Sequence, residues 1–129
     1  MLRNGILNPD INSLLSRVRH TNTLVIADRG FPYWPEVETI DISLIDDIPR
    51  VLDVLRAVQA QCNFGAAFMA DEFRSANEPS TETEFRTALG QVRLSFEPHI
   101  EFKKRVPSAI GLIRTGDTIQ YSNIILESA

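Results

Sequence analysis

The sequence has few of the residues on which small metal-bound or disulfide-bonded proteins depend. It contains one cysteine, Cys62, and two histidines, His20 and His99. A single thiol cannot form an intrachain disulfide, which excludes a secreted scaffold held by disulfides. Two histidines and one cysteine also make a zinc cluster of these residues improbable. We therefore expect no resident metal.

Long apolar runs and glycine-rich phosphate loops are also absent. No run approaches the roughly 20 apolar residues that span a bilayer, and a polar break interrupts the first ten residues before the core of a signal peptide develops. Neither Gly-x-x-x-x-Gly-Lys-Ser/Thr nor Gly-x-Gly-x-x-Gly occurs. The sequence thus predicts a cytoplasmic protein with no membrane partner and gives no support to a phosphate-loop or dinucleotide-binding class.

The charge balance is mildly acidic. Thirteen Lys and Arg residues stand against seventeen Asp and Glu residues, which gives a formal net charge of −4. This balance argues against nucleic acid as the main partner. The 129 residues, with 43% hydrophobic and 23% charged side chains, suit one globular domain over residues 1–129.

Segments with helical spacing of apolar residues alternate with short apolar segments typical of strands. We expect helices at 9–18, 48–61, 81–89 and 98–106, with Asp10 as the N-cap of the first and Cys62 as a core residue on the second. We expect strands at 23–27, 37–43, 65–70, 93–96, 109–114 and 124–126. The alternation predicts an α/β fold with a mainly parallel sheet flanked by helices. So small a sheet leaves apolar surface for a neighbouring subunit to cover.

Two residues with acid–base chemistry flank the first predicted strand. Asp28 directly follows it, and ligands of open α/β sheets bind beyond the carboxyl ends of strands. A carboxylate there can bind hydroxyl groups or orient a histidine, although capping of the loop is an equally good interpretation. His20 follows the first helix, and histidine both donates and accepts protons near neutral pH. We expect the two side chains to share a cleft, although a histidine that only satisfies the helix end is the commoner case.

Further polar side chains suit a ligand with several hydroxyl groups. They are His99, at the start of a predicted helix, and the run Tyr121, Ser122 and Asn123 before the last strand. Each also fits an ordinary structural role at the end of an element.

Three other short segments are open to more than one interpretation. Residues 46–47 and 71–72 are adjacent acidic pairs that could hold a hard cation, but a solvated helix start and a loop explain them better. Residues 33–34, Tyr-Trp between two prolines, could anchor an interface, stack on a sugar or simply pack.

Short blocks along the chain carry a resemblance to a known family. They are Gly-Ile-Leu-Asn-Pro-Asp (5–10), Arg-His-Thr-Asn-Thr (19–23), Val-Ile-Ala-Asp (25–28), Gly-Phe-Pro (30–32), Ile-Asp-Ile-Ser-Leu (40–44), His-Ile-Glu-Phe-Lys (99–103), Ile-Arg-Thr-Gly-Asp (113–117) and Tyr-Ser-Asn-Ile-Ile-Leu (121–126). In this order and spacing they resemble the D-ribose pyranase and L-fucose mutarotase family (RbsD/FucU-like) over nearly the whole chain.

The resemblance implies an isomerase that needs no cofactor. Members open the ring of a monosaccharide by acid–base chemistry and reclose it as the other anomer or in another ring size. The implied catalytic residues are His20, Asp28 and Tyr121. The implied sugar-binding residues are Asp28, His99, Tyr121, Ser122 and Asn123.

The resemblance also implies an α/β fold that assembles into a ring, commonly a homodecamer, with the sugar pocket between neighbouring subunits. Arg29, Phe31 and the aromatic segment 33–34 depart from the residues usual in ribose pyranases, which leaves the identity of the sugar open. Two other interpretations remain: a non-catalytic sugar-binding or transport-accessory protein, and a purely structural ring protein.

Overall fold

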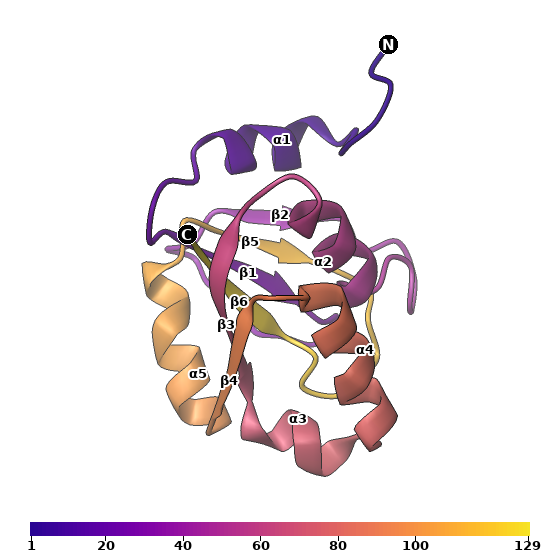
Figure 1. The fold of residues 1–129 in the computed structure, drawn as a ribbon, viewed down its shortest axis with the longest axis vertical. Coiled ribbons are helices and arrows are strands. Elements are labelled where there is room, and N and C mark those ends of the chain that lie inside the picture. Colours follow the sequence, from indigo (N-terminus) through magenta and orange to yellow (C-terminus); the bar gives the residue numbers. More distant parts are fainter.

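A computed structural model describes all 129 residues, and one six-stranded sheet forms its centre (Figure 1). In chain order the strands are β1 (Thr23–Ala27), β2 (Thr39–Asp41), β3 (Phe64–Ala70), β4 (Arg93–Glu97), β5 (Gly111–Arg114) and β6 (Ile124–Ser128). They lie in the order β2-β5-β1-β6-β3-β4. All neighbours are parallel except those of β6, which is antiparallel to β1 and to β3. The mainly parallel α/β sheet is confirmed, with one antiparallel strand inside it.

Helices cover both faces of the sheet. They are α1 (Pro9–Ser16), α2 (Val51–Gln59), α3 (Asp71–Ala76), α4 (Pro79–Leu89) and α5 (His99–Arg105), the last followed by a 3-10 turn (Val106–Ser108). Leu24 and Ile26 of β1 pack into a core with α1, α2, α3 and α4, whereas Val25 and Ala27 pack into a second core with α5. This division follows from the alternation of side chains along a strand. No helix has the length and apolar character that a bilayer span requires.

Both ends of one predicted strand differ from the structure, because local hydrogen bonds set them. The strand expected at 37–43 is reduced to β2. The Val37 N–H donates to the carbonyl of Trp34 and so still belongs to the loop before β2. The Asp41 carboxylate accepts the Ser43 N–H at 2.9 Å and turns the chain after β2. The apolar alternation marked the right region but could not show these competing bonds.

The cap of α1 is Asn8 rather than the predicted Asp10. The side-chain oxygen of Asn8 accepts the N–H groups of Asp10 and Ile11 at 2.9 and 3.0 Å. The helix ends at Ser16, so His20 lies beyond it in a turn.

Replacing Asn8 by Ala should lower the free energy of unfolding by about 1 kcal/mol, since two N–H groups of the first helical turn lose their acceptor. Urea denaturation at fixed protein concentration measures the change. Asn4→Ala is the matched control, because Asn4 lies outside α1 and is exposed. An equal loss in both variants would contradict the capping role.

The position of Cys62 also corrects an expectation. It follows the end of α2 at Gln59 rather than lying on the helix, and it is half-buried against the larger core. Burial raises the pKa of its thiol. Cys62 therefore behaves as a packing residue, and a protonated thiol is a poor nucleophile.

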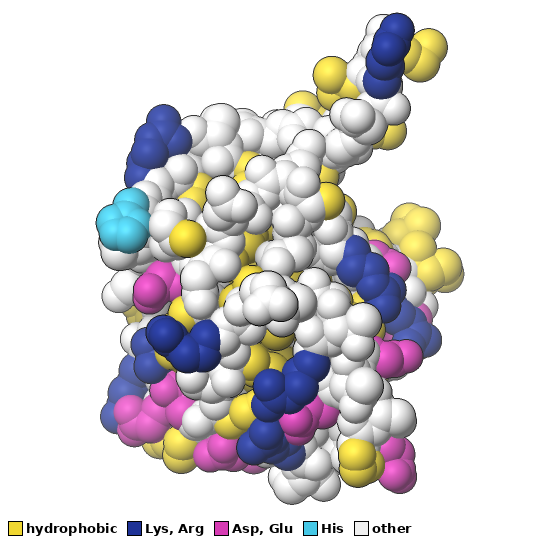
Figure 2. All heavy atoms as spheres, viewed as in Figure 1, with side chains coloured by type: hydrophobic (Ala, Val, Ile, Leu, Met, Phe, Trp, Pro, Cys, Tyr) yellow, Lys and Arg dark blue, Asp and Glu magenta, His cyan; other side chains and the backbone are white.

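The outer edge strand β4 is bordered by ion pairs. On the face shown in Figure 2, basic and acidic side chains lie next to one another over the region of β4, α4 and α5. The pairs include Arg74 with Glu82 and Arg105 with Glu97, and the Arg105 guanidinium also lies 3.9 Å from the centre of the Phe68 ring. Charged side chains disfavour the addition of foreign strands to an exposed edge. This edge is therefore protected against such pairing.

Candidate functional site

Four of the predicted site residues meet at one end of the sheet. Asp28, His99, Tyr121 and Asn123 line a cavity of about 340 Å³. The cavity is completed by Gly30, Phe31, Pro32 and Gln120. Because β6 is antiparallel to β1, the residues before β6 lie at the carboxyl end of β1. The chain therefore brings these side chains together where ligands of α/β sheets bind.

Asp28 is fixed in this cavity by hydrogen bonds. Its backbone N–H donates to the side-chain oxygen of Asn123 at 2.7 Å, and its carboxylate accepts the Gly30 N–H at 3.0 Å. Burial raises the pKa of the Asp28 carboxyl. The N–H groups of Gly30 and Phe31 and the Asn123 side chain oppose the rise in pKa, and the charge of Asp117 adds to it. The result is a carboxyl group more easily protonated than an exposed one.

His99 and Tyr121 form an aromatic contact on the other side of the cavity. Their ring centres are 5.1 Å apart with the planes nearly perpendicular. Tyr121 adopts a left-handed backbone conformation, with φ at 56°. That conformation is unfavourable for a residue with a Cβ, and such strain concentrates at functional sites. The turn before β6 thus holds the phenol against the imidazole.

The imidazole of His99 is half-buried. It stacks on Phe102, with ring centres 5.9 Å apart, and its Nδ1 is buried with no hydrogen-bond partner in the protein. Burial lowers the pKa of His99, and so does the charge of Lys103, while Glu72 and Asp28 act in the opposite direction. The neutral imidazole is therefore favoured at neutral pH, in a form that can accept a hydrogen bond or a proton.

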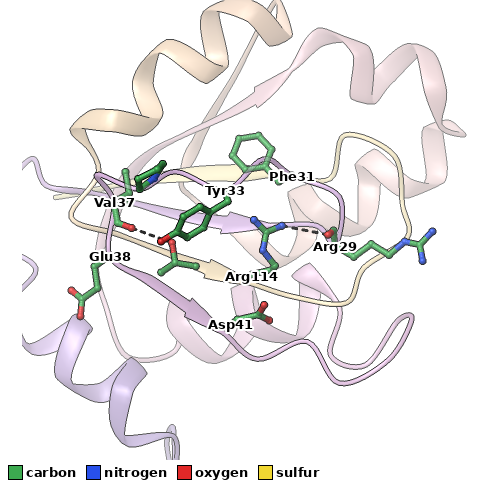
Figure 3. Close-up of a pocket in the computed structure, with 9 residues that line it drawn as sticks. Arg29, Phe31, Tyr33, Val37, Glu38, Asp41 and Arg114 are labelled. Carbon is green, nitrogen blue, oxygen red and sulfur yellow. Dashed lines mark hydrogen bonds between the residues drawn. The ribbon is translucent and has the colours of Figure 1, made fainter.

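A brace behind the site holds the loop that carries Asp28. The guanidinium of Arg114 donates to the carbonyl oxygens of Asp28 and Pro32, each at 3.2 Å, and to that of Arg29 at 3.4 Å. Arg114 is at the end of β5 and reaches the loop from a second cavity, shown in Figure 3. One side chain therefore binds three carbonyl groups of the loop.

The second cavity is larger, about 720 Å³, but it contains none of the predicted site residues. It lies beside the edge strand β2, and Tyr33 and Arg114 are among its lining residues (Figure 3). Of the aromatic pair 33–34, Tyr33 is exposed in this hollow, whereas Trp34 is partly buried and its ring centre is 6.2 Å from that of Phe31. Cavity size alone does not identify the site.

His20 does not join the site within one chain. It is exposed in the turn before β1, whereas Asp28 follows β1. The five residues of β1, which lie between the two, alone span about 16 Å. Within one chain, the structure therefore does not bring the two side chains into one cleft. The turn itself is well defined, because the Asn22 side chain accepts the Arg19 N–H at 2.8 Å.

Ser122 also lies away from the cavity. It is fully buried, and its hydroxyl oxygen has no partner in the protein. Gln120, which directly precedes Tyr121, lines the cavity and was not predicted from the sequence. The Gln120 carbonyl accepts a hydrogen bond from the side chain of Asn77 at 2.9 Å. No local sequence signal connects residues so far apart in the chain.

The sequence and the fold both match known proteins. Residues 1–129 match the RbsD / FucU transport protein family. The chain is 41% identical to a D-ribose pyranase of Geobacillus kaustophilus over 99% of this chain and 93% of that protein, and 38% identical to one of Chromobacterium violaceum over 99% and 97%.

Solved structures agree. Bacillus subtilis RbsD complexed with D-ribose has a TM-score of 0.93 and 29% identity, covering 100% of this chain and 98% of that one. A fucose mutarotase complexed with L-fucose from Streptococcus pneumoniae shares the fold, with a TM-score of 0.83 and 18% identity over 99% and 98%. By sequence and by fold, this chain belongs to the RbsD/FucU family.

Proposed function

We propose that this protein is a sugar isomerase that opens and recloses the ring of a monosaccharide, interconverting anomers or pyranose and furanose forms. The observation that carries the proposal is the convergence of Asp28, His99, Tyr121 and Asn123 on one cavity of about 340 Å³. Relatives at up to 41% identity are named D-ribose pyranase, so ribose is the first substrate that we expect and fucose the second.

Ring opening requires two proton transfers. An acid protonates the ring oxygen while a base removes the proton of the anomeric hydroxyl, and a positioned group contributes about 10²–10⁴-fold to such a step. Asp28, with its raised pKa, and the phenol of Tyr121 are suited to exchange protons with the sugar. His99 and Asn123 would hold hydroxyl groups, and the oxygen of Asn123 is already bound to Asp28, which leaves its NH2 group as donor.

We propose that His20 reaches the site from a second copy of the chain. The two copies would be neighbours in a ring-shaped homo-oligomer, such as the decamer that the resemblance implies. Its exposed turn supports this role, since it presents the imidazole outward. Exposed apolar side chains support assembly. Leu44, Ile45 and Ile48 are 75%, 62% and 50% exposed, and Figure 2 shows apolar groups that project from the loop between β2 and α2. Such groups mark interaction surfaces.

Magnetisation-exchange NMR on a panel of pentoses and hexoses tests the activity. The protein should accelerate exchange between the ring forms of ribose, and Glu84→Gln should leave the acceleration unchanged, because Glu84 is exposed on α4 and lines neither cavity. Unchanged exchange rates over the whole panel would refute the proposal. Binding of a sugar without acceleration would instead support the non-catalytic alternative.

A further inference from the structure

The start of α5 is capped by a residue from a distant helix. Both carboxylate oxygens of Glu72, in the first turn of α3, lie within hydrogen-bond distance of the His99 backbone N–H, at 3.0 and 3.2 Å. The residue before His99 is Pro98, whose side chain supplies no cap. Glu72 thus provides the acceptor that the local sequence of α5 lacks.

We propose that Glu72 is a positioning residue for the sugar site, which fixes His99 at the start of α5 and acts on its imidazole through its negative charge. The proposal rests on the function proposed above, because it gives His99 a role in binding the sugar. It gives a role to one member of the acidic pair at 71–72, for which the sequence allowed two interpretations, a cation site or a loop.

The geometry makes the position of His99 dependent on this cap. His99 is the first residue of α5, a helix of only seven residues, and short helices gain little stability from their own backbone bonds. Its ring must also stay between Phe31, Phe102 and Tyr121. A displacement of about 1 Å at a catalytic site can cost as much as 100-fold in rate. Loss of the cap should therefore reach the chemistry.

The charge of Glu72 acts in the same place. The titratable groups that face the imidazole are Asp28 after β1, Glu72 on α3, Lys103 on α5 and the phenol of Tyr121 before β6. Burial is the main cause that lowers the pKa of His99, and Lys103 lowers it further, whereas Glu72 and Asp28 raise it. Removing either charge on the two helices should shift the pKa of His99, in opposite directions.

NMR titration of the imidazole signals in the full-length protein measures this coupling. The chain has only two histidines, so His20→Ala assigns the signals. Glu72→Gln keeps an acceptor oxygen but removes the charge, and should lower the pKa of His99. Lys103→Gln should raise it. Glu101→Gln is the matched control. It also removes a carboxylate from the first turn of the same helix, namely that of Glu101, which pairs with Lys104.

Sugar exchange rates complete the test. Glu72→Ala, which removes the cap, should lose up to about 100-fold in catalysed ribose exchange, and Glu72→Gln should recover most of that loss. An unchanged His99 titration in Glu72→Gln, or equal losses of rate in both Glu72 variants, would overturn the proposal. If the unmodified protein accelerates no sugar, the proposed function fails, but the titrations still decide whether Glu72 acts on His99.

Discussion

Mixing a His20→Ala variant with an Asp28→Asn variant is expected to restore sugar exchange that neither variant performs alone. Within one chain the two residues lie beyond opposite ends of β1, which is about 16 Å long. A pocket that contains both must therefore combine two chains. Each variant still carries the half that the other has lost.

The size of the recovery follows from this geometry. Each single substitution should reduce catalysed exchange by about 10²–10⁴-fold, the usual contribution of one acid or base. In an equal mixture of randomly assembled chains, a pocket is intact only when His20 comes from the Asp28→Asn chain and Asp28 from the His20→Ala chain. About one quarter of the pockets meet this condition in a closed ring.

The mixing experiment has a matched control and a clear contrary result. His20→Ala mixed with His20→Gln should stay inactive, because every pocket lacks the imidazole. Native mass spectrometry verifies that mixed assemblies form. If they form but activity stays at the level of the single variants, His20 does not act across subunits.

Replacing Asp117 by Ala should reduce the free energy of unfolding by about 3 kcal/mol, since two N–H groups inside the protein lose their acceptor. Asp117 is 1% exposed. One carboxylate oxygen accepts the Val51 N–H at 2.9 Å, at the start of α2, and the other accepts the Ile119 N–H at 2.8 Å. The same carboxylate therefore caps a helix and shapes the chain that leads to Tyr121.

Urea denaturation at fixed protein concentration measures the loss. Asp46→Ala is the control, because the Asp46 side chain is 62% exposed and pairs with Arg29 at the surface. Exposed pairs contribute little to stability, so this variant should unfold close to the unmodified protein. A change in Asp117→Ala no larger than that of the control would contradict the role assigned to the buried carboxylate.

Several of the residues that line the sugar cavity could be predicted, because they lie directly beside strands that the sequence pattern shows. Asp28 directly follows a clearly apolar strand, and Tyr121 and Asn123 directly precede another. The resemblance to known sugar isomerases placed His99 with them. Ser122 lies between Tyr121 and Asn123 in the turn before β6, where Tyr121 has a left-handed backbone conformation. Tyr121 and Asn123 line the cavity, whereas Ser122 is fully buried, and the local sequence does not distinguish the three.

The parts that the sequence did not predict depend on distant contacts. Helix α3 is six residues long, begins after Ala70 without a capping side chain and was interpreted as a loop. The sequence pattern started α2 three residues early, and the Val51 N–H at its start donates to Asp117, far along the chain. The position of His20 relative to Asp28 depends on how copies assemble, which spacing along one chain does not encode.

The place of β6 has a consequence for how the chain acquires its structure. This strand follows all the others in the sequence, yet it joins β1 on one side to β3 on the other. Until it is inserted, the β2-β5-β1 and β3-β4 parts share no backbone hydrogen bonds between strands. We therefore expect the two parts of the sheet to be joined, and the sugar cavity to take its final shape, only when β6 has been inserted between β1 and β3.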